Sequence, residues 1–186
     1  ATLAAAGAAA GVSPVRRNRE RVDARAIGAF EVAMLDALGK TAGVPVCDLL
    51  GGRVRDTVPF SAYLFYKEGR HRFTDDPWVD PWGAALDPDG IVRQARRMVE
   101  LYGFGSLKLK AGHFEPAAEI DAIKALRDAF PGAPLRIDPN AAWHVHTTLD
   151  LLPRMEGLLE YLEDPVPGIP GMAVIQNATS MPLATN

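Results

Sequence analysis

The feature that most constrains the fold of this 186-residue chain is a regular alternation of short apolar strands with amphipathic helices. Helix-like runs repeat their apolar residues every three or four positions, whereas the strand-like runs are short and rich in β-branched, aromatic or leucine residues. Connections of this length carry a crossover helix, so consecutive strands are expected to be parallel. An open doubly wound sheet and a closed eight-stranded barrel both fit this α/β pattern. The strand-like runs are 58–66, 105–112, 134–140, 159–165 and 181–186.

The predicted helices fill the intervals between these strands. A further helical pattern precedes the first strand at 24–43, where Gly43 is suited to end the helix and Pro45 follows it. The chain opens without methionine and stops inside an apparent strand, so we expect it to be part of a longer protein. The helices between strands are predicted at 87–103, 115–130, 147–159 and 168–179.

Composition excludes several classes of protein. Hydrophobic residues make up 48% of the chain and charged residues 23%, which is enough for one sizeable core. The net charge of -3 and the absence of a basic stripe argue against a nucleic-acid partner. The only cysteine, Cys47, allows no intrachain disulfide and fits a cytoplasmic location. No apolar run reaches the roughly 20 residues that a membrane span needs, so we expect no membrane partner.

Two lysines lie close together in the second predicted strand and could have either a structural or a functional role. Lys108 and Lys110 are separated by one residue, and side chains alternate along a strand, so both ammonium groups lie on one face. On an exposed edge, such lysines would only discourage pairing with another chain. At the mouth of an active site, they would instead meet negative charge on a substrate or on neighbouring carboxylates.

Polar residues follow the next three predicted strands at the point where each strand ends. Asp138 and Asn140 end one strand, Glu163 and Asp164 the next, and Asn186 the last. In a barrel the carboxyl ends of the strands converge, and barrel enzymes carry their chemistry there. Each carboxylate by itself also fits a turn, because "DPN" and "EDP" are good turn sequences. Their occurrence in register with the lysine pair favours a common site.

The oxygen-rich character of this set predicts a metal and a reaction. Asp138, Glu163 and Asn186 offer oxygen ligands from three successive strands, which is the ligation that Mg²⁺ prefers. A divalent cation bound to a substrate carboxylate stabilises the negative charge formed when the adjacent carbon loses its proton. A lysine near that cation is disfavoured as an ammonium and can act as the base. The second lysine can stay protonated and neutralise the resulting enediolate.

These residues resemble the enolase superfamily, and within it the glucarate dehydratase group. The stretch "GAFEVAMLDALGKTAGVPVCDLLGG" is similar to the segment that leads into the superfamily's barrel. The stretches "SAYLFY", "KLK", "DPN", "YLEDP" and "LATN" resemble the ends of its first five barrel strands. The successive spacings from Lys110 to Asp138, from Asp138 to Glu163 and from Glu163 to Asn186 are 28, 25 and 23 residues. This ordered set is more specific than the K-x-K pair alone.

The resemblance implies a (β/α)8 barrel of which this chain contains about the first five strands. Residues 1–23 would be a remnant of the N-terminal capping domain or a linker, 24–56 the helix and loop leading into the barrel, and 57–186 the first part of the barrel. The family's second acid/base, a histidine supported by an aspartate, would follow Asn186. The full-length form is expected to be a homo-oligomer.

The activity implied by the resemblance is the Mg²⁺-dependent dehydration of an acid-sugar dicarboxylate, D-glucarate, to a keto-deoxy product. Lys110 would be the base and Lys108 its electrostatic companion. Asp138, Glu163 and Asn186 would bind the metal, and an asparagine at the fifth strand points to the glucarate branch. The implied substrate contacts are Tyr63, Phe65, Lys108, Asn140 and Asn186.

Two other readings stay open at this stage. One is a dehydratase or epimerase of another acid sugar such as galactarate, because later strands would choose between substrates. The other belongs to a different class: a catalytically silent fragment or assembly partner that retains a partial metal site. A histidine-aspartate dyad encoded beyond Asn186 would favour the enzymatic readings.

Overall fold

The computed structural model describes residues 14–71, 75 and 77–185, and the chain divides into two compact units, Ala1–Val58 and Pro59–Asn186. In the described part of the first unit, a long helix α2 (Pro14–Ala42) is followed by the single turn α3 (Val46–Leu49). Helix α2 begins ten residues before the predicted 24–43 segment. Proline is favoured at the first helical position, and the arginines and glutamate that follow are good helix formers without an apolar stripe to reveal them.

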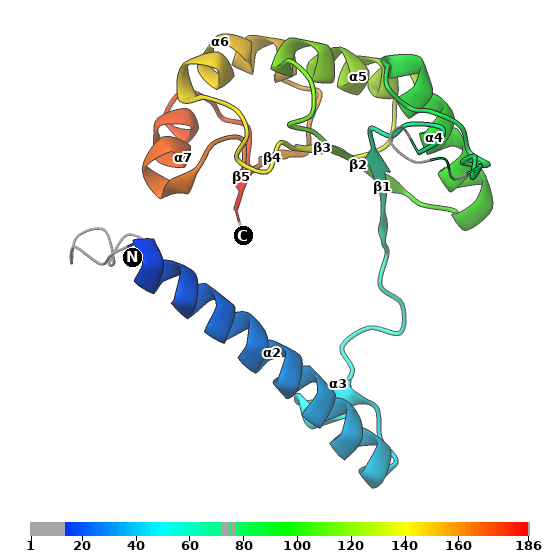
Figure 1. Cartoon of the computed structure of the whole chain (residues 1–186), viewed down its shortest axis with the longest axis vertical. Helices are drawn as coiled ribbons and strands as arrows, with labels where there is room; N and C mark the ends of the chain where they lie inside the picture. Colours follow the sequence, from blue (N-terminus) through cyan, green and yellow to red (C-terminus); the bar gives the residue numbers. More distant parts are fainter. Residues whose placement is uncertain (1–13, 72–74, 76, 186) are drawn as a thin grey trace. The chain divides into compact units, whose positions relative to one another are not determined.

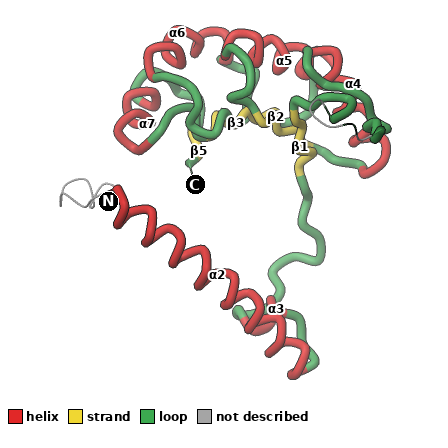
Figure 2. Tube along the Cα trace, viewed as in Figure 1, coloured by secondary structure: helices red, strands yellow, loops and turns green. Residues whose placement is uncertain are grey.

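The second unit contains a parallel sheet of five strands in the order β1-β2-β3-β4-β5, each paired with the next strand along the chain (Figures 1 and 2). This arrangement confirms the predicted α/β fold with parallel strands. It also places the carboxyl ends of all five strands at the same rim. The strands are β1 (Ser61–Phe65), β2 (Ser106–Lys110), β3 (Leu135–Asp138), β4 (Tyr161–Glu163) and β5 (Leu183–Ala184).

Helices α4 (Pro88–Tyr102), α5 (Pro116–Ala129), α6 (Val145–Met155) and α7 (Gly168–Gln176) connect the strands and follow one another in an arc outside the sheet (Figure 1). Helix α4 has a recognisable signal at each end. Asp87 caps α4 by accepting a hydrogen bond from the Gly90 amide at 2.7 Å, and Gly103 ends it at φ +68°. Helix α6 begins two residues before the predicted 147–159 segment and ends four residues before its end.

Alternation along the strands separates a core face from a polar face. Leu107 and Leu109 of β2 are fully buried among helix residues such as Ile91, Ile120 and Ile123. The intervening residues of the strands lie on the opposite face of the sheet. Because the core residues take every second position, the polar face is available for a site. That face carries Tyr63, Phe65, Lys108, Lys110, Arg136, Asp138, Tyr161 and Glu163.

A long excursion joins β1 to α4 and is partly ordered by antiparallel bridges. Lys67 pairs with Ala85, and Arg70 pairs with Val79. The Lys67 ammonium lies 2.5 Å from the Asp80 carboxylate, whose other oxygen accepts a hydrogen bond from the Trp82 amide at 2.8 Å. The excursion therefore has an internal framework of its own beside the first strand.

Candidate active site

Lys108 occupies the centre of the polar face. Its Nζ lies 2.5 Å from Glu163 Oε2 and 3.1 Å from Asp138 Oδ2, and the side chain is almost fully buried. Burial by itself lowers the pKa of Lys108, but hydrogen bonds and ion pairs with Glu163 and Asp138 outweigh it and raise the pKa above the ordinary lysine value. Lys108 is therefore held as an ammonium. Its Nζ also lies 3.5 Å from the Tyr63 hydroxyl and 5.0 Å from the centre of the ring.

Lys110 lies one pleat further along β2, nearer the rim. Its Nζ is 2.5 Å from Asp138 Oδ2 and 3.3 Å from Asn140 Oδ1. The parallel register explains this meeting, because Lys110 of β2 pairs with Asp138 of β3. The structure thus brings together Lys108, Lys110, Asp138 and Asn140, as the strand-end pattern predicts.

Asp138 is fully buried, although it carries a charge. Its Oδ2 faces both lysines, and its Oδ1 accepts a hydrogen bond from the Asn140 amide at 2.9 Å. Burial raises the pKa of Asp138, but the hydrogen bonds from Lys110, Asn140 and Lys108 more than offset that effect and lower the pKa below its usual range. The carboxylate is therefore ionised and tied to two cations.

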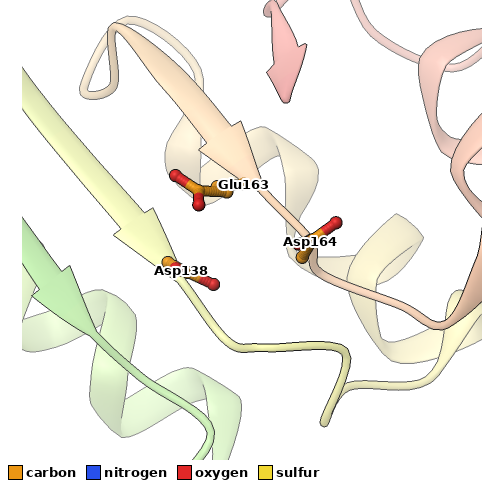
Figure 3. A group of neighbouring side chains, drawn as sticks. All are labelled: Asp138, Glu163 and Asp164. Atoms are coloured by element: carbon orange, nitrogen blue, oxygen red, sulfur yellow. The ribbon is translucent and has the colours of Figure 1, made fainter. Parts of the chain in front are cut away.

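Asp138, Glu163 and Asp164 form an acidic group whose ligand oxygens lie within 4.8 Å of one another (Figure 3). Figure 3 shows the three side chains at the ends of two neighbouring strands, β3 and β4. A compact set of carboxylate oxygens suits a hard cation such as Mg²⁺, so the residues present fit the predicted metal. The side-chain chemistry favours neither zinc nor copper, which select nitrogen or sulfur ligands.

Asp164 belongs to this group although the predicted ligand set omits it. In a regular strand the residue after Glu163 would lie on the opposite face. Asp164 instead has φ +37°, and this left-handed backbone accompanies a carboxylate placed with the other two. Its adjacency to Glu163 is the only sequence signal for it. The third predicted ligand, Asn186, lies outside the described residues.

The predicted substrate residues of β1 lie on the same polar face. Tyr63 and Phe65 are about half exposed, and their ring centres are 6.5 Å apart. Tyr63 also lies beside the ammonium of Lys108. The end of β1 is fixed by Gln94 of α4, whose side-chain amide bonds both the backbone N–H and the C=O of Phe65, at 2.9 and 3.2 Å. Both aromatic rings are thus placed where a ligand above the lysines would meet them.

Comparison with known proteins assigns the family. Residues 90–186 match the family model described as enolase C-terminal domain-like. The chain belongs to the enolase superfamily. A probable glucarate dehydratase from Streptomyces coelicolor is 56% identical over 160 residues, which cover 86% of this chain and 37% of that relative. A muconate cycloisomerase 1 from Rhodococcus opacus is 36% identical over 142 residues, covering 75% of this chain and 33% of the relative.

Solved structures of other superfamily members have the same fold. An enolase from Thermobispora bispora, complexed with magnesium and formate, is 60% identical with a TM-score of 0.79 over 84% of this chain and 37% of that one. An enolase from Pseudomonas fluorescens, with bound magnesium, potassium and tartrate, is 53% identical with a TM-score of 0.80 over 85% and 37%. This chain therefore spans little more than a third of the length of these relatives. Within the part of the chain that the structure describes, no helix is long and apolar enough to cross a membrane.

Proposed function

We propose that this chain forms part of a Mg²⁺-dependent dehydratase of an acid-sugar dicarboxylate, with D-glucarate as the substrate. The observation that carries the reaction class is the pair of lysines that share Asp138 beside the acidic group of the rim. The likeness to a probable glucarate dehydratase supports the choice of substrate. The tartrate bound in a related structure supports a hydroxylated dicarboxylate.

In the proposed reaction, Lys110 first loses the proton that it holds against Asp138 and then, as a neutral amine, removes the proton from the carbon next to a substrate carboxylate. The electron pair of the broken C–H bond moves into that carboxylate and gives an enediolate. Collapse of the enediolate expels the hydroxyl of the neighbouring carbon, which takes up a proton from the second acid/base proposed to follow Asn186 and leaves as water. Lys110 then releases the proton that it removed to solvent. The resulting enol then becomes the keto-deoxy acid by a proton shift, so the sum is the loss of one water.

Lys108 has a different role in this proposal. Because Glu163 and Asp138 keep it protonated, it supplies a fixed positive charge next to the substrate carboxylate. The residues proposed to hold Mg²⁺ are Asp138, Glu163 and Asn186, with Asp164 as an additional carboxylate. When bound, the metal supplies Lewis-acid stabilisation of the charge that develops on the substrate carboxylate.

The remaining residues of the site position the substrate. Tyr63 and Phe65 offer ring surfaces at the rim, and Asn140 offers an amide that already contacts Lys110. Residues 24–56 are proposed as the helix and loop that lead into the barrel and 57–186 as its first part. Residues 1–23 are proposed as a linker or a remnant of the capping domain.

The test is dehydration of D-glucarate and galactarate by the full-length protein, with Mg²⁺ and after its removal by EDTA. We expect Mg²⁺-dependent water loss from glucarate that Lys110→Met abolishes. Lys124→Met, at a half-exposed lysine of α5, is the matched control and should keep wild-type activity. Full activity of Lys110→Met would eliminate the assigned base. A preference for galactarate would support the other acid-sugar reading, and a folded protein without turnover would support a silent role.

A further inference from the structure

A buried carboxylate outside the predicted site lies directly beneath the rim. Glu119, in the first turn of α5, is fully buried and accepts four hydrogen bonds. Its Oε1 accepts from the backbone amides of His113 at 2.8 Å and Phe114 at 3.0 Å. Its Oε2 accepts from the Gly112 amide at 2.9 Å and the Trp143 indole Nε1 at 3.1 Å.

The four donors require a carboxylate at this position. A buried charge is costly unless hydrogen bonds satisfy it, and here each oxygen of Glu119 receives two N–H groups. A neutral amide of the same shape could accept at only one end, because its NH₂ group would face two donors. This set of four donors therefore requires the negative charge of Glu119, and a neutral side chain of the same size would not satisfy it.

The residues that Glu119 holds belong to the loop that leaves β2 immediately after Lys110. Within this loop, the Ala111 amide donates to the Asp138 carbonyl at 2.9 Å. Gly112 has φ +81°, and a Cβ there would lie only 2.4 Å from the Pro139 carbonyl oxygen. The loop after β2 is therefore pressed against the loop after β3.

The same contacts continue to the next strand. Trp143, which donates its indole N–H to Glu119, also donates its backbone amide to the Pro165 carbonyl at 3.0 Å. The Ala141 amide donates to the Asp164 carbonyl at 2.6 Å. Through these bonds the loops after β2, β3 and β4 form one connected layer under the lysines and the acidic group.

Aromatic packing supports the same picture. The Tyr66 ring stacks 5.9 Å from the His113 ring and meets the Phe114 ring edge-on at 4.8 Å. Burial and then the negative charge of Glu119 raise the pKa of Tyr66 well above its ordinary value, so its hydroxyl stays neutral. The loop after β2 is thus held both by the packing of its aromatic side chains and by the hydrogen bonds from its backbone to Glu119.

We propose that Glu119 is a positioning residue that fixes the loop after β2 against the loop after β3 and thereby places Lys110 relative to Asp138. This inference rests on the proposed function in that Lys110 is the base. A carboxylate that touches neither substrate nor metal thus acts on the reaction through the geometry of the lysine. Small displacements of a reacting group have large effects on rate, so the effect on turnover should be measurable.

The experiment compares Glu119→Gln with Asp121→Asn in the full-length protein. Asp121 lies on the exposed side of the same helix, 2.7 Å from Arg154, and serves as the matched control. For Glu119→Gln we expect backbone amides 111–114 to exchange with D₂O about tenfold faster. We also expect kcat for D-glucarate to fall about tenfold or more, with KM changed less than about threefold. Asp121→Asn should change none of these quantities.

Trp143→Phe gives a milder version of the same change, because it removes one donor and keeps an aromatic ring. We expect a smaller loss of kcat in the same direction, and less than additive loss when it is combined with Glu119→Gln. Unchanged amide exchange in both variants would overturn the proposal, as would faster exchange with unchanged kcat. If the wild-type protein dehydrates neither acid sugar, the proposed function fails, and the exchange rates alone decide whether Glu119 holds the loop.

Discussion

The ammonium of Lys108 lies 2.5 Å from the carboxylate of Glu163, although 55 residues separate the two in the sequence. Asp138 lies 3.1 Å from the same ammonium, so one buried cation joins the ends of β3 and β4. Each carboxylate by itself would be costly to bury without a positive partner. Lys108 therefore stabilises the acidic group as well as facing the proposed substrate.

Replacing Lys108 with methionine should make stability depend on the metal. The variant leaves Asp138 paired with Lys110 but removes the ammonium that lies 2.5 Å from Glu163, and losing one partner of a buried ion pair costs about 3–5 kcal/mol. A divalent cation would balance the negative charge that the loss of Lys108 leaves in the acidic group. Because Mg²⁺ binds only the folded state, excess Mg²⁺ should restore part of the lost stability. Urea denaturation in EDTA and in Mg²⁺ measures both quantities. Equal destabilisation of Lys108→Met under the two conditions would contradict the metal site.

The two carboxylates at the end of β4 can be tested separately. Glu163→Gln and Asp164→Asn keep the side-chain shape while removing one negative charge, and asparagine tolerates the left-handed backbone at Asp164. We expect each variant to weaken Mn²⁺ binding by about tenfold or more, because charge count governs the affinity of oxygen sites. Isothermal titration with Mn²⁺ measures the change. Unaltered affinity in Asp164→Asn would remove Asp164 from the ligand set.

The strand-end residues of this site were predictable because strand alternation and parallel register follow directly from sequence. Lys108 and Lys110 share a face in the structure, as strand alternation predicts, and the structure adds that Asp138 is the register partner of Lys110. Asp164 was predicted among the strand-end residues of the rim, but not as a metal ligand beside Asp138 and Glu163, because its positive φ breaks the alternation on which such reasoning depends. Aspartate tolerates a left-handed backbone better than most residues do, but the sequence by itself does not require that angle at Asp164.

Glu119 shows a second limit of sequence reasoning. By helical spacing, Glu119 lies on the same face of α5 as Ile123 and Leu126, which follow it by four and seven residues, so the pattern indicates burial but not how the charge is satisfied. Its burial arises from the loop folding back over the first turn of the helix, and from Trp143, which is 24 residues away. The four N–H donors that satisfy its charge come from other segments of the chain, and helical periodicity cannot identify them. The start of α2 at Pro14 was missed for a related reason, since a polar helix has no apolar stripe.

Gly112→Ala should disturb the rim by a defined steric conflict. The new Cβ would lie 2.4 Å from the Pro139 carbonyl oxygen, and the residue would have to keep φ +81°. We expect a loss of about 1–3 kcal/mol in stability together with a lower kcat, because the loop next to Lys110 must move. Gly132→Ala is the control, since no atom lies within 4 Å of its added Cβ. Thermal melting and kinetics of both variants decide the matter; similar behaviour of the two would be inconsistent with a close-packed rim.

Ala141 offers an opposite test of the same rim, because it already has φ +63°. Glycine adopts this angle without steric cost, whereas a left-handed alanine is strained by about 1–2 kcal/mol. Glycine at position 141 would remove this strain, but part of the gain in stability is offset by the greater freedom of glycine in the unfolded chain. Ala141→Gly should therefore be neutral or stabilising by up to about 1 kcal/mol, and Ala141→Val should be destabilising. Chemical denaturation that ranks valine above alanine would refute the strained backbone at this position.

The ion pair in the excursion between β1 and α4 predicts a pH dependence of stability. The hydrogen bond from Lys67, and then that from the Trp82 amide, lower the pKa of Asp80 below its usual value. A carboxylate whose pKa is lower in the folded state binds fewer protons there than in the unfolded chain. Its stabilising contribution is therefore complete above the unfolded pKa of about 3.9 and is lost as the pH falls through the lower folded value.

Asp80→Asn should accordingly be less stable than the wild type at neutral pH, and the difference should shrink once the pH falls below about 4. Melting temperatures of the two proteins across this range give the difference at each pH. Asp56→Asn is the control, because Asp56 is 89% exposed and only 3.5 Å from Arg53 at the surface, where ion pairs contribute little. A gap between Asp80→Asn and wild type that stays constant or widens in acid would contradict the lowered pKa of Asp80. Because the asparagine oxygen can still accept the hydrogen bond from the Trp82 amide, Asp80→Asn removes mainly the charge-dependent contact with Lys67.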